Sequence, residues 1–205
     1  MNEFDIKAAE WDMNPMHHDR SVAIAKAIME KVPLNKKMTV LEYGAGTGIT
    51  SFILRDHVKE ITLMDNSAEM VRVMNEKITS AKVKNLRSLF FNLETEDFHG
   101  TTFDLIFTQM VLHHVVDIEK IINKFYHLLK PGSSLIIADL YEEDGSFHGE
   151  GFTGHNGFNI ESLSGTLRKF SFSGISHNTC FVIDKKISVT ETKQFEVFMM
   201  TAKRE

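Results

Sequence analysis

A glycine-rich segment between a predicted strand and a predicted helix places the strongest constraint on the fold of this chain. Residues 39–43 are β-branched, apolar or aromatic apart from one glutamate, and Gly44, Gly46 and Gly48 follow at two-residue intervals. Glycine lets the backbone approach a ligand closely, and the first turn of the following helix offers unpaired N–H groups. A strand, a glycine loop and a helix in this order predict a nucleotide-type ligand site at the carboxyl end of a buried strand.

The rest of the chain alternates β-rich runs with helical patterns. Apolar residues between the runs recur at three- and four-residue spacing, as they do over residues 118–129. This alternation is typical of βαβ units around a parallel sheet, and Pro131-Gly132 is expected to close the last of these helices. The predicted strands are Thr39–Tyr43, Glu60–Met64, Leu86–Phe91, Phe103–Thr108 and Ser134–Asp139, followed by an antiparallel hairpin of Ser176–Asp184 and Gln194–Ala202.

Two segments flank this pattern and are expected to cover the ligand site. Residues Phe4 to His18 are aromatic and irregular and predict a lid, after which Asp19 or Ser21 is expected to cap a helix that runs to about Val32. Residues 141–158 hold five of the twelve glycines and predict a long loop on the substrate side. We therefore expect one domain over residues 1–205, with a lid and first helix in 1–33 and a helix from about Ile160 to Phe170.

Composition narrows the class of protein and of partner. The formal charge is 23 − 28 = −5, with lysine and arginine scattered, so no electrostatic footprint for nucleic acid is expected. No apolar run approaches the roughly 20 residues that cross a bilayer, and no cationic, apolar leader opens the chain. With a single cysteine, Cys180, the expectation is a cytoplasmic protein that does not insert into membranes and acts on a small molecule, and the oligomeric state stays open.

The charged residues at the glycine loop indicate which ligand it holds. A dinucleotide fingerprint would need a third glycine at position 49, where this chain has Ile49. Glu42, two residues before Gly44, would repel a pyrophosphate but attract an ammonium group. Asp65, at the end of the second predicted strand, can accept both hydroxyls of a ribose. Adenosine joined to an amino acid satisfies both ends, and a nicotinamide cofactor is disfavoured.

With these residues the chain resembles the class I S-adenosylmethionine-dependent methyltransferases. Five ordered segments within about residues 40–139 carry the resemblance, and they are Glu42–Gly48, Leu63–Ser67, Phe90–Leu93, Phe103–His114 and Leu128–Gly132. In general character the chain is similar to the small-molecule branch that includes the quinone-ring methyltransferases. The resemblance implies an α/β, Rossmann-like, doubly wound seven-stranded sheet with the last strand antiparallel and helices on both faces. It also implies an enzyme that uses S-adenosyl-L-methionine and releases S-adenosyl-L-homocysteine.

The resemblance also implies cofactor contacts at matching positions. Gly44 and Gly46 would face the methionine part, Glu42 would hold its ammonium group directly or through water, and Asp65 would bind the ribose. The remaining implied contacts are Asn66, Asn92 and Leu93 around the adenine, Thr108 under the sulfur, and Trp11 over the cofactor. Alternatives stay open, because Asp65 and Asn66 suit a helix cap, Asn92 suits a turn, and Trp11 suits ordinary packing.

The predicted reaction is methyl transfer to a small organic acceptor by direct in-line displacement. The sulfonium is already activated, so a base is needed only where the acceptor must lose a proton. His148 and His155, within the glycine-rich loop, are the candidate bases. The alternatives are a catalytically inactive binding or regulatory module and a nicotinamide-dependent oxidoreductase.

A metal site is the rival interpretation of the loop. Glu142, Asp144 and Glu150 would supply oxygen ligands beside the two loop histidines. Their spacing matches no metal pattern, so no metal is predicted. His113 and His114 are expected to support structure or to line the cleft.

Overall fold

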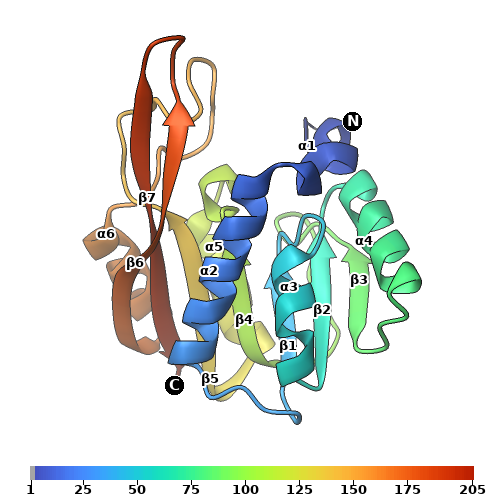
Figure 1. The fold of residues 1–205 in the computed structure, drawn as a ribbon. Helices are drawn as coiled ribbons and strands as arrows, with labels where there is room; N and C mark the ends of the chain where they lie inside the picture. Colours follow the sequence, from blue (N-terminus) through green and yellow to red (C-terminus); the bar gives the residue numbers. More distant parts are fainter. Residues whose placement is uncertain (1–2) are drawn as a thin grey trace.

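The computed structural model describes the backbone of residues 3–205 and the side chains of residues 4–205, so the first two residues of the predicted 1–33 region lie outside it. In this part of the chain, seven strands form one sheet in the order β3-β2-β1-β4-β5-β7-β6 (Figure 1). They are β1 (Thr39–Tyr43), β2 (Glu60–Asp65), β3 (Leu86–Phe90), β4 (Phe103–Gln109), β5 (Leu129–Leu140), β6 (Phe172–Lys186) and β7 (Thr192–Arg204). Strands β1 to β5 pair in parallel, whereas β7 is antiparallel to both β5 and β6. The predicted fold class is confirmed.

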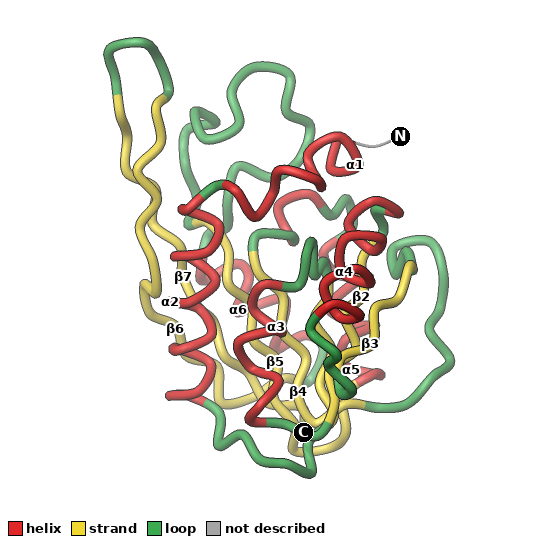
Figure 2. Tube along the Cα trace, turned by 45° about the vertical axis from the view of Figure 1, so that its right-hand side comes forward, coloured by secondary structure: helices red, strands yellow, loops and turns green. Residues whose placement is uncertain are grey.

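Helices cover both faces of the sheet (Figures 1 and 2). Helices α2 (Pro15–Lys31), α3 (Ile49–Leu54) and α4 (Ala68–Ser80) contribute Ile24, Leu54 and Met74 to one apolar core. Helices α5 (Ile118–Leu128) and α6 (Ile160–Lys169) contribute Phe125 and Leu167 to a second core on the other face. The short elements are α1 (Glu3–Lys7) and the 3-10 turns η1 (Ala8–Met13), η2 (Arg55–His57) and η3 (Leu112–His114). Because strand side chains alternate between faces, each central strand feeds both cores.

The N-terminal helix begins earlier than the sequence predicted. Helix α2 starts at Pro15, and its N-cap is Asn14, whose side chain accepts a hydrogen bond from the Met16 N–H at 3.1 Å. The prediction of a cap at Asp19 or Ser21 is wrong, since both residues lie inside this helix. Proline favours the first helical position because it has no N–H to satisfy, so Asn-Pro was the available signal.

The end of α5 was also misplaced. The helix ends at Leu128, and the Pro131-Gly132 pair lies within β5 rather than closing the helix. The β4–β5 register shifts between the Phe103–Leu129 and Leu105–Ser134 pairs, and this irregularity accommodates the proline and the left-handed glycine (φ +77°).

The predicted loop over residues 141–158 is confirmed as a loop with a narrow neck. The Glu142 N–H donates to Phe158 O at 3.0 Å, and the Phe158 N–H donates to Leu140 O at 2.9 Å. A Cβ on Gly157 would lie 2.1 Å from Tyr141 O, so only glycine fits this neck.

The loop lies against the β6–β7 hairpin. An ion pair of 2.6 Å joins Asp144 in the loop to Lys193 in β7, and the Phe147 and Phe195 rings pack at 5.0 Å. Both views show the loop, the tip of the hairpin and α1 beyond the same end of the sheet's strands (Figures 1 and 2). None of the described helices combines the length and apolar character required to cross a bilayer.

Candidate functional site

A cavity of about 930 Å³ lies at the carboxyl ends of the parallel strands. Its lining runs from Asp65, the last residue of β2, and the following Asn66, past Gly44 after β1, to His148 in the loop over residues 141–158. Strand β1 lies between β2 and β4, which is where the strand order reverses. Ligands of open α/β sheets bind at this kind of switch point.

The glycine loop forms the floor of the cavity. Gly44 has a φ of +70°, and a Cβ there would lie 2.3 Å from Cγ2 of Val111. Gly46 has a φ of +57°, and its hypothetical Cβ would have the Trp11 Nε1 as nearest neighbour at 3.8 Å. Trp11 itself stacks on His17 with ring centroids 4.1 Å apart. Glycine is therefore required at position 44 by the nearby Val111 side chain and by the backbone angle, whereas at position 46 only the left-handed backbone favours it.

Asp65 closes the end of the cavity over β2. Its Oδ2 accepts a hydrogen bond from the Gly46 N–H at 2.7 Å, and its Oδ1 accepts one from the Ser67 N–H at 2.8 Å. Burial raises the pKa of this carboxyl to about 6, although these backbone donors oppose the shift. A buried carboxylate at this position can accept hydrogen bonds from ligand hydroxyls.

The three residues predicted around the adenine all line the cavity, and they are Asn66, Asn92 and Leu93. The N-cap of α4 is Ser67, whose hydroxyl accepts from the Met70 N–H at 3.2 Å, so neither Asp65 nor Asn66 fills that position. Asn92 does act as a turn residue, because its Oδ1 accepts from the Glu94 N–H at 3.0 Å.

Glu42 and Thr108 do not line the cavity. The Glu42 side chain is fully buried behind the loop, where it accepts hydrogen bonds from the Ser51 hydroxyl and, at 3.4 Å, from Nε2 of Gln109. Burial raises its pKa to about 8. The Thr108 hydroxyl is also buried and has no hydrogen-bond partner among the described residues.

Two cavity-lining groups that the sequence analysis missed carry unsatisfied polar atoms. Arg20 in α2 is only 7% exposed, yet its Nε has no partner in the described chain and its Nη1 reaches only the Met16 sulfur, at 3.7 Å. Burial lowers its pKa to about 10. Oε1 of Gln109 is likewise buried without a described partner. A buried cation and a buried acceptor on one cavity suit a ligand with one negative and one positive group.

The two histidines predicted as bases are not brought together. His148 lines the large cavity, whereas His155 lines a separate cavity of about 360 Å³, and its Nε2 lies 2.9 Å from Val115 O. His113 and His114, expected to line the cleft or support structure, both line the large cavity. Asp144 is held by Lys193, and the hydrogen bond from that ammonium group lowers the pKa of its carboxyl.

The fold and the site together define a doubly wound α/β protein that binds a nucleoside-containing cofactor at its switch point. A family model described as a methyltransferase domain matches residues 34–168. The chain therefore belongs to this methyltransferase family, as its resemblance to the class I S-adenosylmethionine-dependent methyltransferases implied. This membership removes the nicotinamide-dependent oxidoreductase as an interpretation.

Relatives in sequence carry methyltransferase names. The chain is 32% identical over 152 residues to an uncharacterized methyltransferase of Schizosaccharomyces pombe, covering 66% of this chain and 54% of that protein. It is 27% identical over 117 residues to a demethylmenaquinone methyltransferase of Listeria monocytogenes, covering 56% of this chain and 49% of that protein. The chain thus spans about half the length of these relatives.

Solved structures share the fold over most of the chain. A methyltransferase in complex with the Trm112 methyltransferase activator of Haloferax volcanii superposes with a TM-score of 0.79 at 18% identity, covering 100% of this chain and 98% of that one. A S-adenosylmethionine-dependent methyltransferase of Aquifex aeolicus gives 0.65 at 21% identity, covering 88% and 89%. At these identities the likeness establishes the fold alone.

Proposed function

We propose that this protein transfers the methyl group of S-adenosylmethionine to a small organic acceptor by direct in-line displacement. The observation that carries the proposal is the single cavity of about 930 Å³, which reaches from Asp65 past the glycine loop to His148. A cavity of this size has room for a cofactor and a small acceptor side by side, so the reacting atoms can be held adjacent to each other. Proximity of this kind supplies most of what methyl transfer needs from a protein.

The residues present fit the cofactor at its nucleoside end. Asp65 would accept the ribose hydroxyls, and Asn66, Asn92 and Leu93 would contact the adenine. Trp11, whose Nε1 is the part of the ring nearest to Gly46, would cover the glycine loop and exclude water.

The unsatisfied atoms fit the cofactor at its amino-acid end. Arg20 would pair with the methionine carboxylate, and Oε1 of Gln109 would accept a hydrogen bond from the ammonium group. Glu42 would then act through Gln109, whose amide it holds from behind, rather than touch the ammonium group itself. The position of Thr108 under the sulfur stays a prediction, and Thr108 itself is not among the residues that line the cavity.

S-adenosylmethionine supplies an activated methyl group on a positively charged sulfur. The chain's own task is then to orient the acceptor and to remove its proton where one must leave. We propose that His148 contributes to that task, because it lines the same cavity as the glycine loop. A catalytic role for His155 stays a prediction, and its ring hydrogen bond to the backbone supports a structural role in the loop.

We propose residues 1–205 as one catalytic domain that acts on a small molecule in the cytoplasm. The support for one domain is the continuity of the sheet, in which β6 and β7 extend the β1–β5 core and also contribute Lys185 to the cavity. The support for a small acceptor is the size of the cavity, about 930 Å³, which is in the range of small-molecule sites.

Calorimetric titration of the purified protein with S-adenosylhomocysteine, beside NAD, tests the cofactor half. We expect micromolar binding of the first alone, which corresponds to roughly −8 kcal/mol. Transfer of labelled methyl to a panel of phenols, amines and quinols then tests the reaction. Binding without transfer to any acceptor would favour the inactive module, and absence of binding would overturn the proposal.

A further inference from the structure

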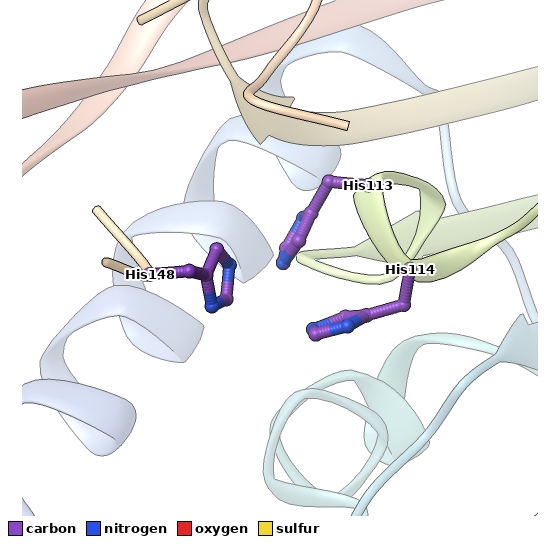
Figure 3. A group of neighbouring side chains, drawn as sticks. All are labelled: His113, His114 and His148. Carbon is purple, nitrogen blue, oxygen red and sulfur yellow. The ribbon is translucent and has the colours of Figure 1, made fainter. Parts of the chain in front are cut away.

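We propose that His113, His114 and His148 form a site for a divalent transition-metal ion such as Zn²⁺ at the acceptor end of the cavity. Each residue offers one ring nitrogen, and these atoms lie within 4.8 Å of one another. Figure 3 shows the three rings converging, two from η3 and one from the loop over residues 141–158. The site itself is independent of the proposed methyl transfer, but the role assigned to the ion rests on it.

The spacing of the rings is close to what such an ion requires. The ring centroids are 4.2 Å apart for His113 and His114, 5.0 Å for His113 and His148, and 5.3 Å for His114 and His148. Tetrahedral zinc with bonds of about 2.0–2.1 Å separates its nitrogen ligands by about 3.3 Å. The ligand nitrogens of the three histidines lie up to 4.8 Å apart, so a shift of about 1.5 Å or less brings them to the separation that zinc requires. His148 lies in a loop and is the ligand that can make the movement.

A buried carboxylate supplies independent support, because it orients one of the three rings. Nδ1 of His113 lies 2.6 Å from Oδ1 of Asp139, and both side chains are almost completely buried. Asp139 is fixed in turn by the Leu140 N–H at 2.8 Å. A proton held on Nδ1 by the carboxylate leaves the lone pair of His113 on Nε2. A carboxylate bound to a metal-ligating histidine in this way is the usual outer partner of a metal site.

Aromatic neighbours hold the other two rings. His148 stacks on Phe152 with centroids 3.8 Å apart and an interplanar angle of 15°. The His114 ring meets Phe4 edge-on at 5.1 Å and Phe152 at 5.4 Å. Apolar walls of this kind exclude water and strengthen coordination by neutral imidazoles.

The charge balance of the region also accommodates a cation. The Asp139 carboxylate offsets part of the added charge, and it also raises the pKa of the neighbouring Arg20 against the effect of burial. In the proposed complex the methionine carboxylate pairs with Arg20, so that guanidinium would not oppose the ion. A ligand set made only of imidazoles suits zinc, iron, copper or nickel rather than magnesium or calcium.

Three protein ligands leave one coordination position for the acceptor. A hydroxyl bound there would have a lowered pKa and would release its proton to water. The acceptor oxygen then bonds to the methyl carbon while the bond from that carbon to sulfur breaks, and sulfur keeps the electron pair. The ligand class is thus an oxygen acceptor bound as its anion, and His148 would be a metal ligand rather than a free base.

Titration of the chelator-treated full chain with Co²⁺, followed by its visible absorption, tests the site directly. We expect one equivalent to bind with micromolar affinity, and His114→Gln and His148→Gln each to weaken binding by tenfold or more. Asp139→Asn keeps all three ligands and should weaken binding about 10- to 100-fold through the orientation of His113. His177→Gln is the control, since His177 is exposed on β6 and lies outside the cluster, and this variant should bind as the wild type does.

Titration of the same proteins with S-adenosylhomocysteine reports separately on the cofactor half. A variant that binds this product normally but has lost Co²⁺ has a folded cavity and a damaged metal site. The metal proposal is overturned if the wild type binds Co²⁺ no more tightly than the His114→Gln/His148→Gln double variant. That result would leave the proposed methyl transfer standing, whereas loss of product binding in the wild type would overturn the proposed function instead.

Discussion

The Oδ2 atom of Asp65 lies 2.7 Å from the backbone nitrogen of Gly46, so the end of β2 is hydrogen-bonded directly to the glycine loop that follows β1. This contact fixes the position of a buried carboxylate whose pKa is raised to about 6. Near pH 7.5 the carboxyl is ionised and can accept hydrogen bonds from a ribose. Below about pH 6 it holds a proton and loses much of that capacity.

Cofactor affinity should therefore fall in acid. Because the ligand binds the ionised form of Asp65, the affinity for S-adenosylhomocysteine should drop by up to about tenfold for each pH unit below about 6. Asp65→Ala should abolish binding, and Asp65→Asn should bind weakly with little dependence on pH. Calorimetry between pH 8 and pH 5 checks this, and an Asp65→Ala variant with normal affinity would show that the site is misassigned.

The two central glycines of the loop should respond differently to alanine. In Gly44→Ala the new Cβ would meet Val111 at 2.3 Å, so the loop must shift and both stability and cofactor binding should fall. In Gly46→Ala the nearest atom is Trp11 Nε1 at 3.8 Å, so the fold should lose only about 1–2 kcal/mol from the left-handed backbone. Its methyl group would still lie in the glycine loop, where the cofactor is proposed to bind, so cofactor affinity should fall. Thermal unfolding and calorimetry on both variants separate the two effects.

Arg20 should matter for one part of the ligand only. Arg20→Ala should weaken S-adenosylhomocysteine binding by about 10- to 100-fold, because a hydrogen bond to a charged group is worth about 1.5–3 kcal/mol. Binding of 5′-methylthioadenosine, which lacks the amino-acid part, should not change. Arg20→Lys is the conservative control and should restore part of the affinity. If Arg20→Ala lowered the affinity for both ligands equally, Arg20 would not pair with the carboxylate of the amino-acid part.

Glu42→Gln should change how stability depends on pH. The folded state holds the Glu42 proton up to about pH 8, while the unfolded chain releases it near 4.5. Unfolding thus releases a proton over this window, and the wild type should lose up to about 1.4 kcal/mol of stability per pH unit from this group as pH rises. The Glu42→Gln variant has no ionisable group at this position, so its stability does not fall for this reason as the pH rises. Urea unfolding from pH 5 to pH 9 should show the variant gaining on the wild type until about pH 8, and parallel curves would contradict the assignment.

The parts of the fold and site that local sequence determines were predictable. Gly44, Gly46 and Asp65 follow strands whose alternation is visible in the sequence, and parallel strands bring their carboxyl ends to one edge. Two predicted boundaries were wrong because more than one local signal was present. Helix α2 begins at Asn14-Pro15 rather than at the later candidate caps, and β5 continues through Pro131 because its pairing with β4 is irregular there.

The remaining site residues depend on packing between distant segments. Arg20 is buried because α2 packs over the cavity, and nothing in its helical neighbours marks it as a ligand. His148 meets His113 only because the neck of the loop turns it back toward η3, a separation of 35 residues that no spacing rule connects. Glu42 was predicted to hold an ammonium group from its charge and from the family resemblance, and the direction of its side chain toward Ser51 depends on tertiary packing.

The loop over residues 141–158 is attached to the β6–β7 hairpin, so two different parts of the chain line the cavity. The family model ends at residue 168, before β6 begins, while Lys185 of β6 lines the cavity and donates a hydrogen bond to Phe147 O in the loop. Most of the proposed cofactor contacts, from Gly44 to Gln109, lie inside the matched region, whereas Trp11 and Arg20 precede it. Substitutions in the hairpin can therefore change the cavity wall around Lys185 without changing the glycine loop, so we expect related chains whose last two strands differ to differ in the acceptor that they methylate.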